Sequence, residues 1–324
     1  RRRREARTMS GTRRMALLGG LALALPAPGA PRAQTAAGEQ VGPLAFPSPE
    51  RGFAAMAQAA QRQDQQELLR ILGGGARALI RSGDPTADRA ALRRFAEAYA
   101  EKAEIQRPAP DRAELLVGRD AWPLPIPMVR RNGSWRFDAK QGALELVNRR
   151  IGRNELDTIE ALHAIVDAQD EYARTAGRQG AFRAYARRFF STPGTHDGLY
   201  WPTLDGQAES PLGALAAAAS AGGYGLSRDP ADAPRPFHGY LFRMLEAQGP
   251  HAPGGATDYV VDGRMIGGFG VIAWPAQYGV SGIQTFLVSH AGTVYQRNLG
   301  PETARLARGI TAFDPGPGWE RVAE

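Results

Sequence analysis

The stretch RRIGRNELDTIEALHAIVDAQDEYA, residues 149–173, predicts a long amphipathic helix in the middle of the chain. Its apolar side chains recur at spacings of three and four residues, which places them on one helix face. They are Ile151, Ile159, Leu162, Ile165, Val166 and Tyr172, with Gln169 on the same face. The preceding segment 143–147 is also predicted to be helical. The segments before and after this helix in the sequence differ in their predicted elements. The start of this stretch therefore divides the chain into two predicted domains, 48–148 and 149–324.

The first domain begins with helices. Ser48 is a capping residue and Pro49 suits the first helical position, while Asp64 is expected to cap a second helix that ends at the glycines 73–75. A third helix is expected over 90–103. Short strands follow at 113–117, 126–130 and 134–138, the last two joined by the hairpin turn Asn132-Gly133.

The second domain continues from the long helix with short helices at 182–190 and 214–221. Strands are predicted at 240–247, 268–274, 283–289 and 294–299, separated by glycine-containing turns. Helices combined with antiparallel strands define an α+β fold class for the whole chain.

Each domain resembles a known class of structure. Helices followed by a small antiparallel sheet that closes in NGSWRFD resemble the cone-shaped α+β domains of the nuclear-transport-factor-2-like class. A helix followed by an antiparallel meander is similar to the globular part of type IV pilins and pseudopilins. Pilins extend that helix towards its N-terminus as a lipid-embedded rod, whereas here another domain precedes it, so fibre assembly by that route is not expected.

The N-terminal segment predicts export. After Met9 comes a basic pair, Arg13-Arg14, then an apolar run over 15–25 and a tail of small residues and prolines. This is the form of a cleaved secretory signal, and the apolar run is shorter than the roughly 20 residues that cross a bilayer. Residues 1–34 are therefore predicted to be a signal peptide, read as a Sec signal or as a twin-arginine signal, and residues 35–47 a flexible linker. The expected location is periplasmic or secreted, with no stable membrane span after processing.

Charge and cysteine content exclude several classes of function. The chain has 40 Lys and Arg against 33 Asp and Glu, and residues 1–34 hold eight of the basic residues and one acidic residue, which leaves 32 against 32. A balanced remainder gives no indication of a nucleic-acid partner. The sequence has no cysteine, which excludes disulfides, thiol nucleophiles and thiolate-bound metals.

Long motifs along the chain carry a family resemblance. Among them are GRDAWPLPIPMVRRNGSWRFDAKQG, FFSTPGTHDGLYWP and AWPAQYGVSGIQTFLVSHAGTVYQRNLG. Together they resemble the family known as domain of unknown function 2950, and the resemblance covers nearly all of the chain after the signal. It implies exported bacterial proteins and assigns no activity.

The first turns of the long helix carry a polar cluster, formed by Arg149, Arg150, Arg153, Asn154 and Glu155. Arginine pairs carboxylates with two parallel hydrogen bonds, so Arg150 or Arg153 is predicted to bind carboxylates of the first domain. The preferred interpretation is an interdomain joint. A solvated helix face and a grip for an anionic ligand are the alternatives.

A second set of polar side chains lies on loops rich in Gly and Pro. His196, Asp197 and Ser210 are the candidates for catalysis, as a base, its orienting acid and a nucleophile. Candidates for ligand binding are Tyr200, Trp201, His238, Tyr240 and His251. No serine has the GxSxG context and no histidine spacing matches a metal motif, so neither a metal nor a cofactor is expected. The alternative is that these side chains stabilise their own loops.

These observations favour a non-catalytic binding or scaffolding protein of the cell envelope. Its partner is expected to be another envelope protein or a cell-wall component, and the sequence does not set the oligomeric state. The alternative is a cell-wall or small-ester hydrolase that uses the loop His, Asp and Ser residues.

Overall fold

The computed structural model describes residues 42–180, 182–203, 209–225 and 235–323. The predicted signal peptide, 1–34, lies outside them. The predicted linker 35–47 needs a correction at its end, because Leu44 and Phe46 pack against the first hydrophobic core. The backbone N–H and C=O of Phe46 both hydrogen-bond to Trp135, at 2.8 Å each. Residues 44–46 are therefore part of the folded structure.

The first half opens with four helices, α1 (Pro49–Gln61), α2 (Gln65–Leu72), α3 (Arg77–Ile80) and α4 (Pro85–Glu101), with the 3-10 turn η1 (Gly74–Ala76) before α3. The predicted caps are confirmed: Ser48 accepts from the Arg51 N–H and Asp64 from the Glu67 N–H. Helix α4 begins five residues before the predicted position, because Asp84 caps it and Pro85 occupies its first turn.

A four-stranded antiparallel sheet follows, in the order β1 (Ala103–Ala109), β2 (Arg112–Val117), β3 (Trp122–Arg131) and β4 (Ser134–Phe137). The hairpin at Asn132-Gly133 is confirmed, and both residues have positive φ, at 51° and 78°. Strand β3 alternates buried apolar residues with prolines in WPLPIP, so its core face is Leu124, Ile126 and Met128. Strand β1, for which no element was predicted beyond the end of the expected helix at residue 103, lies at the sheet edge.

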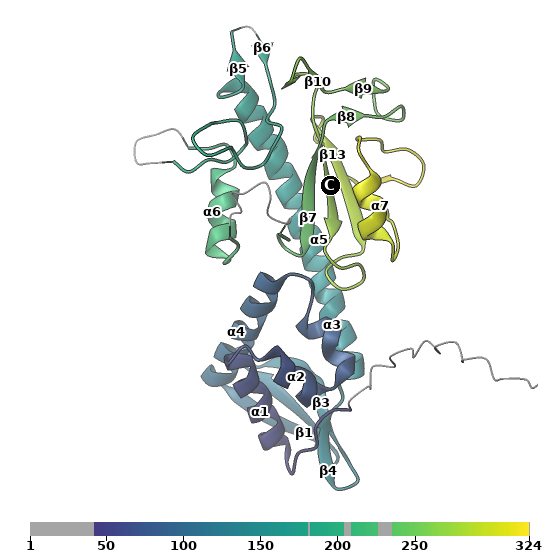
Figure 1. The fold of residues 1–324 in the computed structure, drawn as a ribbon. Coiled ribbons are helices and arrows are strands. Elements are labelled where there is room, and N and C mark those ends of the chain that lie inside the picture. Colours follow the sequence, from purple (N-terminus) through teal and green to yellow (C-terminus); the bar gives the residue numbers. More distant parts are fainter. Residues whose placement is uncertain (1–41, 181, 204–208, 226–234, 324) are drawn as a thin grey trace, which may run out of the picture. The chain divides into compact units, whose positions relative to one another are not determined.

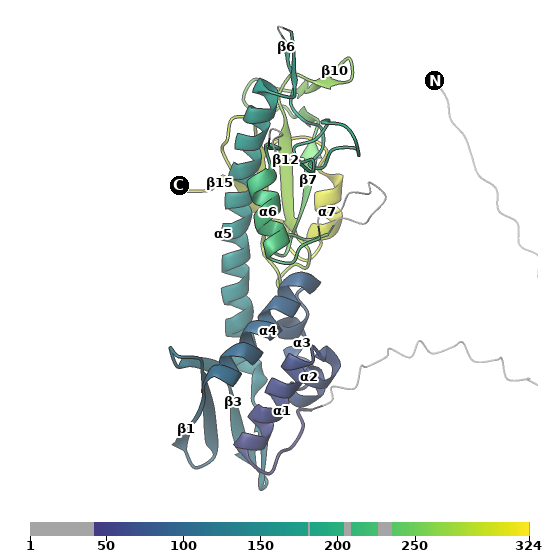
Figure 2. The same cartoon turned by 90° about the vertical axis from the view of Figure 1, so that its left-hand side faces the viewer.

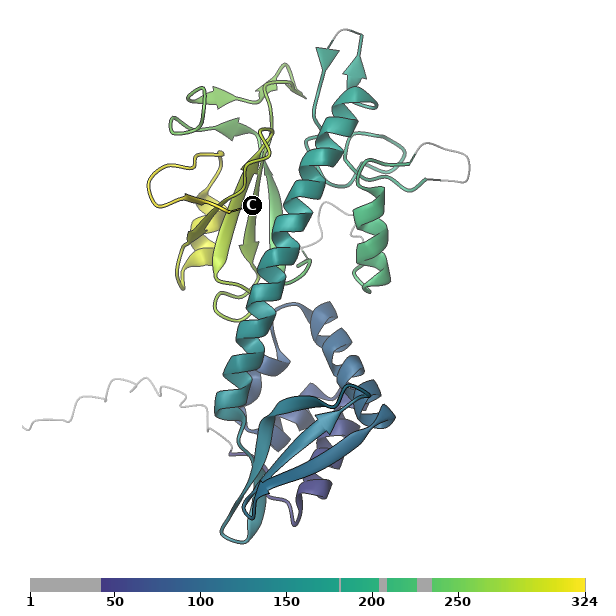
Figure 3. The ribbon, with the colours of Figure 1, turned by 180° about the vertical axis from the view of Figure 1, so that it is seen from behind.

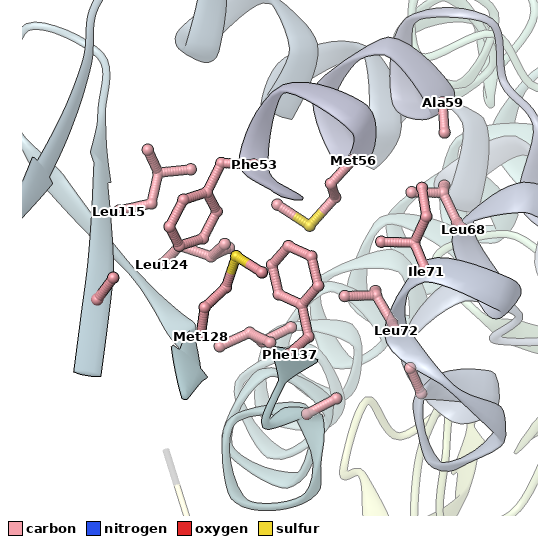
Figure 4. Close-up of a cluster of buried hydrophobic side chains, with 14 of the residues drawn as sticks. Phe53, Met56, Ala59, Leu68, Ile71, Leu72, Leu115, Leu124, Met128 and Phe137 are labelled. Atoms are coloured by element: carbon pink, nitrogen blue, oxygen red, sulfur yellow. The ribbon is translucent and has the colours of Figure 1, made fainter. Parts of the chain in front are cut away.

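The first core lies between this sheet and helices α1 and α2. Figure 4 shows Phe53 and Met56 of α1 with Leu68, Ile71 and Leu72 of α2, facing Leu115, Leu124, Met128 and Phe137 from the strands. Phe53 and Phe137 meet edge to face, with ring centroids 5.4 Å apart.

Helix α5 (Ala139–Arg174) is one continuous helix of 36 residues. Its first turns belong to the first core through Ala139 and Leu146, and its later turns belong to the second core through Leu162, Ile165 and Tyr172. The predicted domain boundary between residues 148 and 149 therefore falls inside a helix. Gly142 makes a close approach to the sheet, since a Cβ there would lie 1.5 Å from the carbonyl oxygen of Pro125.

The second half is built on a five-stranded antiparallel meander. Its order is β15 (Glu320–Arg321), β14 (Tyr295–Asn298), β13 (Gln284–Ser289), β12 (Gly270–Pro275) and β7 (Tyr240–Leu245). The four predicted strands correspond to β7, β12, β13 and β14.

Helices cover both faces of this sheet, as Figures 1, 2 and 3 show. Val271, Ala273 and Phe286 face α5 in the second core. Ile272, Trp274 and Leu287 face the other way, towards α7 (Thr303–Gly309). All six residues of β12 are buried as a result. This arrangement confirms the α+β class.

Short elements lie on both sides of β7 in the sequence. Between α5 and β7 are β5 (Arg178–Gln179), β6 (Phe182–Arg183) and α6 (Gly213–Ala221). Between β7 and β12 are β8 (Ala247–Gln248), β9 (Thr257–Asp258), β10 (Val260–Val261) and β11 (Arg264–Met265). The predicted helix over 182–190 is wrong. Gln169 of α5 donates to the Ala186 carbonyl and accepts from its N–H, both at 2.8 Å, and this pair holds the segment in a non-helical conformation. Among the described residues, no helix combines the length and the apolar composition that crossing a bilayer requires.

Candidate functional site

Several buried polar groups lie around the middle of α5, among them Asp84, Asn154 and Ser281. Arg150 donates to the backbone carbonyls of Ala78 and Leu79, with the Ala78 bond at 2.9 Å. These carbonyls lie at the C-terminal end of α3, which carries unpaired C=O groups and a partial negative charge. One guanidinium therefore ties α5 to the helices of the first half.

One turn further on, α5 contacts the loop that joins β12 to β13. The amide of Asn154 donates to the Ser281 carbonyl at 2.8 Å. The Glu155 carboxylate accepts from the N–H groups of Ile283 and Gln284, at 2.8 and 3.0 Å. Within six residues, α5 thus contacts both halves of the chain.

Asp84 makes a second connection between the halves. One carboxylate oxygen accepts from the N–H groups of Thr86 and Ala87 and so caps α4. The other accepts from the Tyr224 hydroxyl at 3.0 Å and from the Gly239 N–H at 2.9 Å. Asp84 is 1% exposed, so all four donors reach a carboxylate that water hardly contacts. Four donors compensate for the cost of burying that charge.

The turn that Asp84 holds is the tight connection His238-Gly239, which leads into β7. Both residues have positive φ, 49° and 75°, and Phe237 and Tyr240 pair across them. A Cβ at position 239 would lie 2.5 Å from the Asn154 amide nitrogen, so only glycine allows this contact. His238 itself pairs with Asp157 of α5, Nδ1 to Oδ2 at 3.2 Å.

We call this set the α5 cluster: Asp84, Arg150, Asn154, Glu155, Tyr224 and Tyr240. Burial raises the pKa of the Tyr224 and Tyr240 hydroxyls well above the usual range, and the charges of Asp84 and Glu155 raise them further. Burial also raises the pKa of Asp88, which lies beside the cluster and accepts from the Ser82 N–H. The tyrosines are therefore neutral donors at physiological pH, and their role in the cluster is to hydrogen-bond.

The Tyr240 contacts predict a pH dependence. Its hydroxyl donates to the Gln284 carbonyl at 2.9 Å and lies 3.4 Å from Glu155. A phenol whose pKa is raised on folding stabilises the protein fully below about pH 10 and loses that contribution as the pH rises through the folded value. We expect Tyr240→Phe to cost about 1 kcal/mol at neutral pH and to reduce the alkaline loss of stability by about 1.4 kcal/mol per pH unit. Urea unfolding at a series of pH values measures both effects, and parallel alkaline slopes for the two proteins would contradict the assignment.

The predicted polar cluster at residues 149–155 divides into two groups in the structure. Arg150, Asn154 and Glu155 make the contacts described above, although Arg150 binds carbonyls rather than the predicted carboxylates. Arg149 pairs instead with Glu145 one turn back on the same exposed face. Arg153 makes no hydrogen bond or ion pair with any residue that the structure describes, and its side chain is exposed.

The candidate catalytic residues do not come together. The His196 ring stacks on Trp201, with centroids 4.3 Å apart. Asp197 accepts from the N–H and hydroxyl of Thr192 and from the hydroxyl of Thr195, which closes its own loop. Within the described ranges, no hydrogen bond joins the side chains of His196, Asp197 and Ser210. A base and its orienting acid need such a contact.

The other loop candidates also have local partners. Trp201 is buried under His196, and Tyr200 packs edge to face on Phe190. His251 pairs with Asp314, Nδ1 to Oδ2 at 3.0 Å. His238 and Tyr240 contact α5, through Asp157 and Glu155, and do not belong to the loop that carries His196, Tyr200 and Trp201. In the part of the chain that the structure describes, no three His, Asp or Glu side chains are grouped as metal ligands would be.

Sequence reasoning missed Asp84 and Tyr224 as members of the cluster. The Asp-Pro pair at 84–85 signals a helix start, which accounts for one carboxylate oxygen. The second oxygen binds residues 140 and 155 positions later in the chain, and no local pattern contains that information.

The fold and this cluster define the chain as an α+β protein whose buried polar groups connect helices to a meander. The family model described as "Protein of unknown function (DUF2950)" matches residues 44–322, so the chain belongs to that family. The resemblance expected from the motifs is thereby confirmed. No curated protein matches the chain significantly. No solved structure does so either. The likeness of the two halves to nuclear-transport-factor-2-like domains and to pilins stays a prediction.

Proposed function

We propose that this protein is a non-catalytic binding or scaffolding protein of the cell envelope. One observation supports this proposal most directly: among the described residues, no hydrogen bond joins the side chains of the three catalytic candidates His196, Asp197 and Ser210. His196 instead stacks on Trp201, and Asp197 closes its own loop by accepting from Thr192. Catalytic groups must instead lie within reach of one another and of a substrate.

The α5 cluster supports the scaffolding part of the proposal. Arg150 binds the end of α3, while Asn154 and Glu155 bind the β12–β13 loop. Asp84 adds a contact from the start of α4 to the turn before β7. We propose that these bonds act as the joint that fixes the two halves, so that surfaces on both can be presented together.

The sequence supports the proposed location and the proposed kind of partner. The signal-like segment 1–34 supports export to the periplasm or the cell surface, and the balanced charge of the remaining chain supports a partner other than nucleic acid. An envelope protein or a cell-wall component is the proposed partner.

The hydrolase alternative offers a direct test. We expect no hydrolysis of nitrophenyl esters or of peptidoglycan above background, and no change in the His196→Ala and Ser210→Ala variants. Ser134→Ala, in the β3–β4 hairpin, is the matched control. Turnover by the wild-type protein that falls at least about a hundredfold in Ser210→Ala but persists in Ser134→Ala would overturn the proposal, since loss of a nucleophile has effects of that size or greater.

The binding role has its own test. The tagged protein is used to capture components from an extract of the native envelope, which mass spectrometry then identifies. We expect a component captured in stoichiometric amounts, and equally by the His196→Ala/Ser210→Ala double variant. Capture that requires those two side chains, or no stoichiometric component at all, would contradict the proposed role.

A further inference from the structure

Two buried aspartates lie at the start of α4. Asp84 caps the helix, and Asp88 follows one turn later, with its N–H bonded to the Asp84 carbonyl at 3.0 Å. Their exposed fractions are 1% and 8%, so water hardly reaches either side chain. Among the described residues, every hydrogen bond to these two carboxylates comes from a backbone N–H or a hydroxyl, and none comes from a basic side chain.

The two carboxylates differ in the donors that they receive. Asp84 accepts from four residues, Thr86, Ala87, Tyr224 and Gly239. Within the described ranges, Asp88 accepts from Ser82 alone, whose N–H lies 3.2 and 3.1 Å from its two oxygens and whose hydroxyl also contributes. Burial favours the neutral form of a carboxyl unless donors compensate for its charge. Asp84 has that compensation, and Asp88 has much less of it.

The charges that face Asp88 do not replace the missing donors. On its own helix it faces Asp84, and a second carboxylate so close favours the neutral form of one of the two. From α5 it faces Arg150, whose guanidinium donates to the carbonyls at the end of α3 instead and is itself repelled by Arg153. Burial raises the pKa of Asp88 and Asp84 raises it further, whereas Ser82 and Arg150 lower it by less.

The remaining polar groups nearby are already paired. The Tyr224 hydroxyl is neutral and donates to Asp84. In the turn before β7, His238 pairs with Asp157 of α5, Nδ1 to Oδ2 at 3.2 Å. Asp88 is therefore the carboxyl of this region whose charge has the least support.

We propose that the packing of α4 against α5 takes up a proton at Asp88. In the packed protein the Asp88 carboxyl holds a proton on one oxygen and accepts from Ser82 with the other. When the contact opens, water solvates the carboxylate and the proton passes to the solvent. Mild acid then tightens the contact between the two halves, and for this consequence alone the inference rests on the joint that we propose above.

The sign of the pH dependence follows from which state binds the proton. An aspartate in an unfolded chain has a pKa of about 3.9, and the pKa of Asp88 in the folded protein lies above its ordinary value. Between the two values the folded state binds more protons. The contribution of Asp88 to stability is therefore fully present below about pH 3.9 and is lost as the pH rises through the folded value.

The test compares the full chain with its Asp88→Asn variant by urea unfolding between about pH 4 and pH 8. The amide has the shape of the protonated carboxyl, its oxygen can accept from Ser82, and it does not ionise. We expect the unfolding constant of the wild type, divided by that of the variant, to rise with pH by up to about tenfold per pH unit and then to level off. Glu160→Gln removes one negative charge from the exposed face of α5 and measures the effect of net charge alone.

A second measurement needs no variant. The Ser82 N–H donates to Asp88, so its amide resonance in nitrogen-15 NMR spectra of the wild type follows the charge of that carboxyl. We expect its titration midpoint to lie above the ordinary range of aspartate. A midpoint at or below about 3.9, or a ratio of unfolding constants that changes with pH no more than it does for Glu160→Gln, would overturn the proposal. Proton uptake in a protein that captures no envelope component would instead contradict the proposed function and leave this inference standing.

Discussion

Replacing Asp84 with alanine is expected to lower the free energy of unfolding by about 4 kcal/mol. The change removes the cap of α4, which costs about 1 kcal/mol. It also leaves the Tyr224 hydroxyl and the Gly239 N–H without their acceptor in a buried region, at about 1–3 kcal/mol each. Urea unfolding followed by circular dichroism measures the loss.

Asp64→Ala is the matched control, because the Asp64 side chain caps α2 through a bond to the Glu67 N–H and makes no second hydrogen bond to any residue that the structure describes. A loss of about 1 kcal/mol is expected there. The Asp84 variant should also unfold over a broader range of urea concentration, as the two halves lose a shared contact. Equal losses for Asp64→Ala and Asp84→Ala would show that the second carboxylate oxygen contributes nothing.

Gly142→Ala is expected to destabilise the protein by about 3 kcal/mol or more. A Cβ at this position would lie 1.5 Å from the Pro125 carbonyl oxygen, and backbone cannot move aside as a flexible side chain can. Helix α5 must then shift away from β3, which separates packed side chains in the first core; overpacking of this kind costs about 1–3 kcal/mol, and more where the backbone is involved.

The same helix supplies the opposite control. A Cβ at Gly152 would meet nothing within 4 Å, so Gly152→Ala changes helix propensity alone. We expect it to stabilise the protein by about 1 kcal/mol. Denaturant midpoints of the two variants should therefore move in opposite directions, and a Gly142→Ala midpoint at or above that of the wild type would rule out the close packing of α5 on β3.

Much of the fold could be predicted because its signals are local. Ser48, Asp64 and the Asn132-Gly133 turn each act within a few residues, and the structure has each of them in its expected role. The strands of the meander were recognisable from runs of apolar residues between glycine turns. Strand β12 is buried on both faces, so its sequence GVIAWP is apolar throughout rather than alternating.

The errors have tertiary causes. The segment 182–190 has apolar spacing that fits a helix, but Gln169 binds the backbone of Ala186 and Tyr185 binds Met265, which hold it in a different conformation. The α5 cluster was only half foreseen for the same reason. Arg150, Asn154 and Glu155 were recognisable as a polar group at a helix, whereas Asp84 joins them from a loop far away in the sequence.

Helix α5 is unbroken from Ala139 to Arg174. The number of residues between two positions on it therefore fixes the angle about the helix axis between the directions in which their side chains point. Gly142 must face β3 while Asn154 faces Gly239, and each residue added between them would turn one contact by about 100° relative to the other. Only insertions or deletions close to whole helical turns could preserve both orientations, and even those would move the contacts apart along the axis. The number of residues between Gly142 and Asn154 is thus as much a structural requirement as their identities.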